Sequence, residues 1–351
     1  MHQSSQISKE VKLNILVDVG HPAHVHLFKY FIKYLKEKGH RVIVTSRDKD
    51  ITLELLEKYG IENICISRSK KNIILKLLEL VVRDIRTFHL HFKNKFDFSF
   101  GTSINITHLT AIFGVPSYVF SESDDSAIKL HTILAYPFAT NIIIPKSIKY
   151  EKWKNKRVIH NSSHKLAYLH PNHFKPNPKV LEKYNLRENE FVIMRKSALA
   201  AHHDINARGV DDSLWQKIKD LLAKYQIVDS VEGFKSLKID ATDMHDLLYF
   251  AKMLIGDSQS MSMEAAFLGT PCVRISTFGG KLNAIEELEN NYALLYSYHP
   301  DDESSILKRI KSLLRDKALE NKFAERRKRM LDVMDDFTDW MIVFFEKEVQ
   351  P

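Results

Sequence analysis

The sequence predicts an α/β protein with two Rossmann-like, doubly wound parallel-sheet domains that face an interdomain cleft. Short β-branched apolar runs alternate with amphipathic segments of roughly 10–15 residues, which is typical of successive βαβ units and a parallel sheet. The proline- and asparagine-rich stretch 168–178 interrupts this alternation as a linker does. A chain of 351 residues also exceeds the usual size of a single core.

The first half of the chain contains the elements of one complete domain. Lys12–Val19 is an apolar strand that ends at Gly20, and a helix follows from Ala23 to Lys38. Because Ile73–Ile85 carries apolar residues at helical spacing, we expect it to pack on its own sheet. The other expected elements are Arg41–Ser46, Asp50–Tyr59, Ile61–Ile66, Phe96–Phe100, Ser117–Ser121, Asn141–Pro145 and Arg157–Ile159.

A second alternation follows the linker. We expect strands at Phe191–Arg195, Ile227–Ser230, Met253–Ile255 and Cys272–Ile275, and helices at Asp212–Tyr225, Met244–Ala251, Met261–Leu268, Ser304–Arg329 and Asp335–Val349. The predicted domains are therefore 1–172 and 173–335. Residues 336–351 would form a C-terminal helix that packs back on the N-terminal domain.

Charge is unevenly distributed along the chain. Residues 1–170 hold 26 Lys+Arg and 15 Asp+Glu, whereas the remaining 181 residues hold 26 and 29. The basic half therefore faces an anionic partner, such as nucleic acid, a membrane surface or a phosphorylated acceptor. Without zinc-finger spacing, an RNP-like run or a helix-turn-helix, no nucleic acid is expected. Arg68–Lys95, with eight Lys+Arg against two acids, suits peripheral membrane contact as an additional role.

Cysteine use and the lack of long apolar runs indicate the compartment. No run approaches roughly 18 uncharged apolar residues, and the N-terminus lacks the apolar core of a secretory signal. Cys65 and Cys272 lie in apolar runs and are expected to be buried free thiols of a reducing compartment. The expected location is the cytoplasm, with the inner face of the membrane as a further option.

The most informative motif is Leu254–Ser276, in which an apolar strand, a small polar loop and a helix succeed one another. A helix that begins near Ser260 presents backbone N–H groups to a phosphate, and Ser258 and Gln259 add side-chain donors. Glu264, one turn into the helix, can accept hydrogen bonds from both ribose hydroxyls. The alternative is an ordinary strand–loop–helix unit with a serine cap.

Basic residues end the first strand of the second domain. Arg195 and Lys196 suit the charge of a departing nucleoside diphosphate, although a plain surface role is the alternative. His202 follows shortly after, and Gly279 lies in a glycine-rich loop after the last sheet strand, so both are candidates for sugar contacts.

The segment Asp18–His26 joins the first strand to the first helix, at the edge where open α/β sheets bind ligands. His21 could deprotonate a sugar hydroxyl, because the ordinary pKa of histidine lies near neutral pH. His24 and His26 could cap, pack or bind sugar. The three spacings do not place these histidines on one helical face, so no metal site is expected.

Two other strand ends in the first domain carry polar residues. Glu122 follows one strand and is the second catalytic candidate, as an acid or a base; a solvated acidic loop is the alternative. Gly101, Thr102 and Ser103 follow another strand and could contact the acceptor or the diphosphate.

The second-domain motif resembles the nucleotide-binding motif of the GT-B superfamily, which includes non-hydrolysing UDP-N-acetylglucosamine 2-epimerases and the lipid-linked N-acetylglucosaminyltransferase of peptidoglycan synthesis. The resemblance carries diphosphate binding onto Ser258, Ser260 and the Met261 amide, and ribose binding onto Glu264. From about Leu13 to Arg329 the chain is similar to a family of predicted glycosyltransferases with a GHPAHVH-type motif. The arginines that follow the epimerase histidine are absent, which argues against faithful epimerase chemistry.

The function that these observations predict is metal-independent sugar transfer from a nucleotide-diphosphate donor, a UDP-sugar above all, to an acceptor in cell-surface polysaccharide or glycolipid synthesis. The nucleotide sugar is a substrate, and no cofactor is expected. A 2-epimerase or sugar-nucleotide hydrolase is the first alternative. A non-catalytic protein that binds membrane or nucleic acid is the second.

Overall fold

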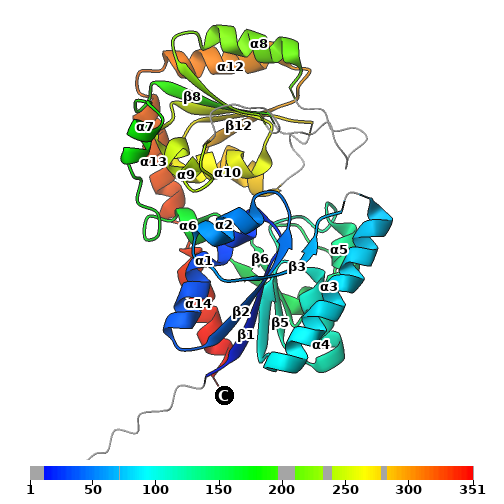
Figure 1. The fold of residues 1–351 in the computed structure, drawn as a ribbon. Helices are drawn as coiled ribbons and strands as arrows, with labels where there is room; N and C mark the ends of the chain where they lie inside the picture. Colours follow the sequence, from blue (N-terminus) through cyan, green and yellow to red (C-terminus); the bar gives the residue numbers. More distant parts are fainter. Residues whose placement is uncertain (1–11, 71, 197–209, 232–238, 278–282, 351) are drawn as a thin grey trace, which may run out of the picture. The chain divides into compact units, whose positions relative to one another are not determined.

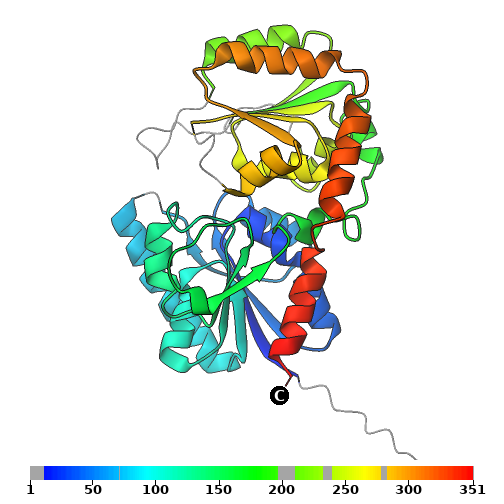
Figure 2. The ribbon, with the colours of Figure 1, turned by 180° about the vertical axis from the view of Figure 1, so that it is seen from behind.

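The computed structural model describes residues 12–70, 72–196, 210–231, 239–277 and 283–350 (Figures 1 and 2). The chain divides into two compact units. The first unit comprises Met1–Phe120, Leu130–Ile143 and Asn155–Val158, and the second comprises Ser121–Lys129, Ile144–Lys154 and Ile159–Pro351. The division at residues 172 and 173 stays a prediction.

A seven-stranded sheet forms the centre of the first unit. Its strands lie in the order β3-β2-β1-β4-β5-β6-β7, and the central pairs β1–β2 and β1–β4 are parallel. The strands are β1 (Asn14–Val19), β2 (Arg41–Asp48), β3 (Ile64–Arg68), β4 (Phe98–Gly101), β5 (Ser117–Phe120), β6 (Asn141–Pro145) and β7 (Arg157–His160). β1 is buried on both faces, as a near-continuous apolar run in a parallel sheet requires.

Helices cover both faces of this sheet (Figure 1). The strands β2 and β3 are added on one side of β1 and the later strands on its other side. As a result, α1 (Pro22–Glu37) and α2 (Thr52–Lys58) pack on one face of the sheet, while α3 (Ile73–Asn94) and α4 (Ile104–Phe113) pack together on the other. The remaining short elements of this part of the chain are α5 (Lys129–Ala135) and the 3₁₀ turn η1 (Lys154–Lys156).

A five-stranded sheet forms the centre of the second unit, in the order β12-β11-β10-β8-β9. Its strands are β8 (Phe191–Lys196), β9 (Gln226–Val231), β10 (Met253–Gly256), β11 (Cys272–Ile275) and β12 (Leu295–Tyr298). The helices that belong to it are α8 (Asp212–Leu221), α9 (Met244–Phe250), α10 (Gln259–Leu268), α11 (Asn283–Glu286), the π-helical turn η2 (Glu287–Asn291), α12 (Glu303–Arg315) and α13 (Leu319–Leu331). The neighbours α8 and α12 cover one face, and α9 and α10 cover the other (Figure 1).

Three further helices lie outside this alternation of strands and helices. α6 (Leu166–Leu169) and α7 (Lys179–Lys183) precede β8, and α14 (Phe337–Glu348) follows α13. α14 packs on α6, where the Thr338 hydroxyl donates to the Ala167 carbonyl at 2.8 Å. Figure 2 shows α13 leading into α14 at the end of the chain. The fold is therefore the predicted α/β class with two parallel sheets.

Three local expectations are wrong, and the strand β12 was not expected. The single helix Ser304–Arg329 is two helices, because the backbone is extended at Asp316, where α12 ends, and α13 begins only at Leu319. Cys65 is exposed on the edge strand β3, whereas Cys272 is buried, and both thiols are free. Most apolar residues of α3 are exposed, and its fully buried residues are Glu79, Arg83 and Thr87.

Candidate functional site

In the first unit, the loops after β1 and β4 meet at the carboxyl edge of the sheet. Asp18 and Gly101 are partners in the parallel register. A Cβ atom on Gly101 would lie 2.9 Å from the Asp18 carbonyl oxygen, so only glycine permits this approach. The approach places Thr102 and Ser103 beside Gly20, whose added Cβ would lie 3.5 Å from the Ser103 hydroxyl. The predicted residues of these two loops therefore form one cluster.

The three histidines of the opening motif have different environments. His21 is the N-cap of α1: its Nδ1 accepts from the Ala23 amide at 3.2 Å, and its half-exposed ring lies 5.7 Å from the ring of His24. His24 is hydrogen-bonded to the Thr102 hydroxyl at 2.8 Å. His26 is buried, with Nδ1 3.2 Å from the Tyr59 hydroxyl. His21 and His24 thus belong to the cluster, and His26 packs behind it.

The tautomer of His21 follows from its cap. Because Nδ1 uses its lone pair to accept from the Ala23 amide, the proton of the neutral ring lies on Nε2. In this geometry the N–H group of His21 lies on Nε2, which is 3.8 Å from the Asp50 carboxylate. The base role predicted for His21 requires the cap to open or the tautomer to change.

In the second unit, β10 leads into the N-terminus of α10. A Cβ atom on Gly256 would lie 2.1 Å from the Arg195 carbonyl oxygen, and the Asp257 amide donates to that oxygen at 3.2 Å. This close approach joins the end of β8 to the loop before α10. Ser258 caps α10, and its hydroxyl accepts from the Met261 amide at 3.5 Å. The helix begins one residue earlier than the expected Ser260.

The first turn of α10 presents the predicted donors. Gln259 is exposed, and Ser260 and Met261 are partly exposed. The first amides of any α-helix lack intrahelical acceptors, so this turn offers N–H groups to an anion. The two predicted cations differ: Arg195 lies in register with Gly256, whereas the Lys196 ammonium pairs with Asp212 at 2.5 Å.

Glu264 is buried, one turn further along α10. Its Oε1 accepts from the Tyr168 hydroxyl at 2.8 Å and lies 3.5 Å from His245 Nε2. Burial favours a raised pKa, but the nearby charges of His245 and Lys165 and these hydrogen bonds lower the pKa of Glu264 below its ordinary value. The carboxylate is therefore ionised at neutral pH, and protein groups already bind one of its oxygens.

Glu122 is the centre of a second buried ionic group in the same unit. Its carboxylate accepts from the Ser163 hydroxyl and the His164 amide, and it lies 3.3 Å from the Lys165 ammonium. Burial would raise its pKa, yet Lys165, His164 and these hydrogen bonds lower the pKa of Glu122 to about 2. An acid this strong stays ionised, and its conjugate base is weak.

Sequence reasoning missed the segment that links these two carboxylates. Lys165 is buried, pairs with Glu122, and also lowers the pKa of Glu264 through its charge. Tyr168 lies one turn further along the same segment and binds Glu264. The run SHKLAY carries a lysine and a tyrosine three residues apart, where the linker begins. This spacing, which puts the two side chains on one side of a helical turn, was the feature of the sequence that could have indicated their role.

Arg274 is a second residue that the sequence did not single out. It lies on β11 in register with Gly256, and only 2% of its surface is exposed. Its Nε has no hydrogen-bond partner among the residues that the structure describes. Burial lowers its pKa, while Glu289 and Asp257 oppose that effect. A buried cation therefore lies beside the strand end that leads to α10.

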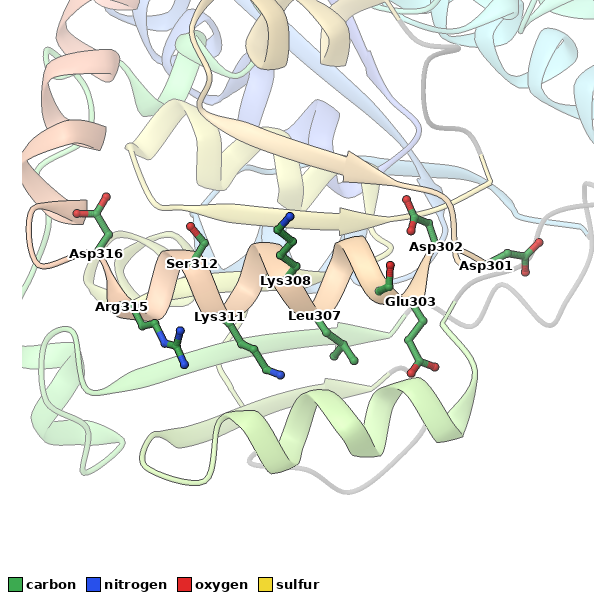
Figure 3. Close-up of a pocket in the computed structure, with 10 residues that line it drawn as sticks. Asp301, Asp302, Glu303, Leu307, Lys308, Lys311, Ser312, Arg315 and Asp316 are labelled. Atoms are coloured by element: carbon green, nitrogen blue, oxygen red, sulfur yellow. The ribbon is translucent and has the colours of Figure 1, made fainter.

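Other candidates do not join these clusters. His202 and Gly279 lie outside the described residues. A hollow of about 1080 Å³ lies along α12 (Figure 3). The exposed side chains of Lys308 and Lys311 are among its lining residues, and no predicted site residue lines it. Ligand atoms of His173, Asp336 and Asp339 lie within 4.8 Å of one another, but Asp336 caps α14 and accepts from His173 at 3.0 Å.

The comparisons with known proteins identify the family. Residues 13–346 match the family described as "Protein of unknown function (DUF354)". The chain belongs to this family. It is also 22% identical over 285 residues to the uncharacterized protein MJ0665 of Methanocaldococcus jannaschii. The matched region covers 75% of this chain and 82% of that protein.

Solved structures share the fold over nearly the whole chain. The S. aureus MnaA–UDP structure has a TM-score of 0.67 at 14% identity and covers 95% of both chains. The UDP-GlcNAc 2-epimerase of M. jannaschii has a TM-score of 0.66 at 13% identity, over 96% of this chain and 100% of that one. The spinosyn forosaminyltransferase SpnP has a TM-score of 0.65 at 12% identity, over 97% and 100%. The DUF354 chain therefore has a GT-B-like fold.

Proposed function

We propose that this DUF354 protein is a metal-independent glycosyltransferase that uses a UDP-sugar donor, and that α10 holds the diphosphate of the donor. The observation that carries the proposal is the geometry of Gly256. That glycine brings the first turn of α10 against the end of β8, so helix amides and Arg195 face the same strand edge. Amides at a helix N-terminus favour an anion through both their free donors and the helix dipole.

Glu264 would bind the ribose with Oε2. Because Tyr168 and His245 contact Oε1, they fix the carboxylate and leave its other oxygen for a ribose hydroxyl. The sequence predicted that both oxygens of Glu264 bind the ribose. The contact proposed here uses one oxygen of a carboxylate that Tyr168 and His245 already hold in position.

Arg274 and Arg195 would stabilise the diphosphate as it leaves, since fixed cations act strongly on charge that develops away from water. Lys196 is less suited to this task, because Asp212 holds its ammonium. Glu122 would position Lys165, a role that its low pKa favours over acid or base work.

The acceptor would bind to the first unit, at the cluster of His21, His24, Thr102 and Ser103. Its proposed class is a glycan or lipid-linked acceptor of surface polysaccharide or glycolipid synthesis, handled on the cytoplasmic side. His21 and its neighbour Asp50, 3.8 Å from Nε2, would contact the hydroxyls of the acceptor. The second candidate is a UDP-sugar 2-epimerase, which the likeness to the M. jannaschii epimerase supports.

The test measures binding of UDP, UDP-glucose and UDP-N-acetylglucosamine by calorimetry to the full chain and to two variants. Glu264→Gln keeps the shape of the side chain and removes its charge, so we expect a loss of affinity of roughly 10- to 100-fold. Glu320→Gln, an exposed glutamate on α13, is the matched control and should bind as the parent does. Equal affinity of Glu264→Gln and the parent, with folding intact, would refute the proposal.

A second experiment distinguishes sugar transfer, epimerisation and hydrolysis. The protein is incubated with the UDP-sugar that it binds, and the products are identified by NMR. Transfer predicts that the donor stays intact until a lipid-linked or glycan acceptor is added, and that UDP then forms with the glycosylated product. Conversion of UDP-N-acetylglucosamine to its 2-epimer without an acceptor assigns the epimerase. Release of free sugar and UDP without an acceptor assigns the hydrolase.

A further inference from the structure

The orientation of α3 is the reverse of that expected of an amphipathic helix in water. Its buried residues are polar: Glu79 accepts two hydrogen bonds from Arg47 at 2.6 Å, and Arg83 pairs with Asp18 at 2.8 Å. Thr87 accepts from the Asn105 amide at 3.1 Å. Hydrogen bonds and ion pairs therefore hold the fully buried residues of the helix in place.

The outward face of α3 is apolar and continuous. Ile74, Leu78, Val81 and Ile85 follow one another at spacings of four, three and four residues, so they form one stripe. Their exposed fractions are 64%, 58%, 54% and 61%. The stripe is widened by Ile73, Leu75, Leu77, Val82 and Phe92, which are also exposed. A contiguous exposed apolar stripe of this kind marks an interaction surface.

Exposed basic residues accompany this stripe on α3 and just before it. Lys70 and Lys93 are exposed, and Arg86 is exposed while it donates to the Ile66 carbonyl. Both acids of the helix have partners: Glu79 pairs with Arg47, and Asp84 is hydrogen-bonded to His108. The outward face therefore combines aliphatic side chains with exposed cations.

A hollow beside α3 has the same mixed chemistry. It measures about 440 Å³ and is lined by Leu75, Leu78 and Val82 together with Arg68, Lys70 and Arg86. Asp48 and Glu79 also line it, but Arg68 lies 3.4 Å from Asp48 and Arg47 binds Glu79. Such a hollow accommodates an aliphatic chain next to an anionic group.

We infer that the outward face of α3 docks on an anionic phospholipid surface, with the stripe in the acyl region and the exposed cations at the headgroups. An interfacial helix needs an apolar face and basic residues beside it, and α3 has both. No helix in the described ranges is long and apolar enough to cross a membrane. A second copy of the chain would cover the stripe without using the exposed cations beside it, whereas an anionic surface uses both.

The test is flotation of the full chain with vesicles of phosphatidylcholine alone or of phosphatidylcholine mixed with phosphatidylglycerol. We expect binding to the mixed vesicles only. The double variant Leu78→Ser/Ile85→Ser should lose at least about tenfold in partition, because two large apolar side chains no longer enter the lipid. The matched double variant Val333→Ser/Val343→Ser removes two equally exposed valines from the second unit and should bind as the parent does.

A charge variant tests the cations separately. Lys70→Glu/Lys93→Glu should weaken binding to mixed vesicles by roughly tenfold or more, and added salt should reproduce that loss. Failure of the parent to bind mixed vesicles, or equal binding by the Leu78→Ser/Ile85→Ser variant, overturns the inference. A dimer in light scattering that this variant converts to a monomer also overturns it and assigns the face to a second copy.

Measuring UDP binding alongside vesicle binding tests the lipid surface and the proposed function independently. The Leu78→Ser/Ile85→Ser variant should bind UDP with the affinity of the parent, since no residue of α10 is changed. Loss of vesicle binding with UDP binding intact therefore isolates the lipid surface. Intact vesicle binding in a protein that binds no UDP-sugar would refute the proposed function alone.

Discussion

Two helices of this molecule have similar amphipathic patterns and opposite orientations. α12 buries Ile306, Ile310 and Leu313 against its sheet and exposes Lys308 and Lys311. α3 fully buries a glutamate, an arginine and a threonine and exposes most of its aliphatic residues. Apolar side chains fill the buried positions of the first helix, whereas hydrogen bonds and ion pairs fill those of the second.

The difference teaches that an apolar stripe identifies a helix but not the medium that it faces. A stripe packed on the protein core and a stripe packed on lipid have the same spacing. The direction is decided by the partners of the opposite face. In α3, those partners are Arg47, Asp18 and Asn105, which lie on other elements far away in the sequence.

The largest effect is expected from breaking the ion pair that docks α3. Arg83→Ala leaves Asp18, a fully buried carboxylate, with the Thr45 hydroxyl at 2.7 Å and without its cation. We expect a loss of about 3–5 kcal/mol in the free energy of unfolding, measured by urea denaturation. Arg315→Ala, an exposed arginine of α12, should change it by less than about 0.5 kcal/mol. Equal values for both variants would contradict the ionic docking of α3.

The next effect concerns the apolar docking of α12. Ile310→Ala removes a side chain with no exposed surface and leaves a cavity, so we expect a loss of about 2–4 kcal/mol in the same denaturation experiment. The slope of the free energy against urea should stay unchanged, since the unfolded surface is nearly the same. A loss below about 1 kcal/mol would show that α12 is not anchored by its core face.

The boundaries of some regular elements could be predicted from the sequence, and their partners could not. The expected strand Asn141–Pro145 is β6 residue for residue, and the polar loop expected after β10 does lead into a helix, α10, with Ser258 as its cap. These features depend on neighbours in the chain. Lys165 binds Glu122 across 43 positions, and Tyr168 binds Glu264 across 96. Pairing over such separations is fixed by the packing of whole elements, which a single sequence does not display.

Acid should loosen α3 more than α12. Burial favours a raised pKa for Glu79, but hydrogen bonds from Arg47 and Ser67 lower its pKa below the ordinary 4.5. The ionised form therefore stabilises the fold above pH 4.5, and that contribution is lost as pH falls through the lowered folded-state pKa. In hydrogen exchange corrected for intrinsic rates, protection of α3 should fall on the order of tenfold between neutral pH and about pH 3.

The α12 amides serve as the internal reference for this acid titration, because the buried residues of α12 are Ile306, Ile310 and Leu313, none of which titrates. Their protection should change less than that of α3 over the same range. A parallel loss in both helices would mean that acid unfolds the whole chain and that Glu79 has no local role.

The smallest effect is expected on the outward face of α3. Ile85→Ser exchanges a side chain that is 61% exposed for a polar one of similar helix propensity, so the free energy of unfolding should change by less than about 0.5 kcal/mol. Ile306→Ser on α12 makes the same exchange at a side chain with no exposed surface and should cost several times more, about 2–4 kcal/mol. Thermal and urea denaturation of the two variants measure the contrast directly. Because the same substitution is compared on two helices, any intrinsic cost of serine cancels, and the remaining difference reports the medium that each isoleucine faces.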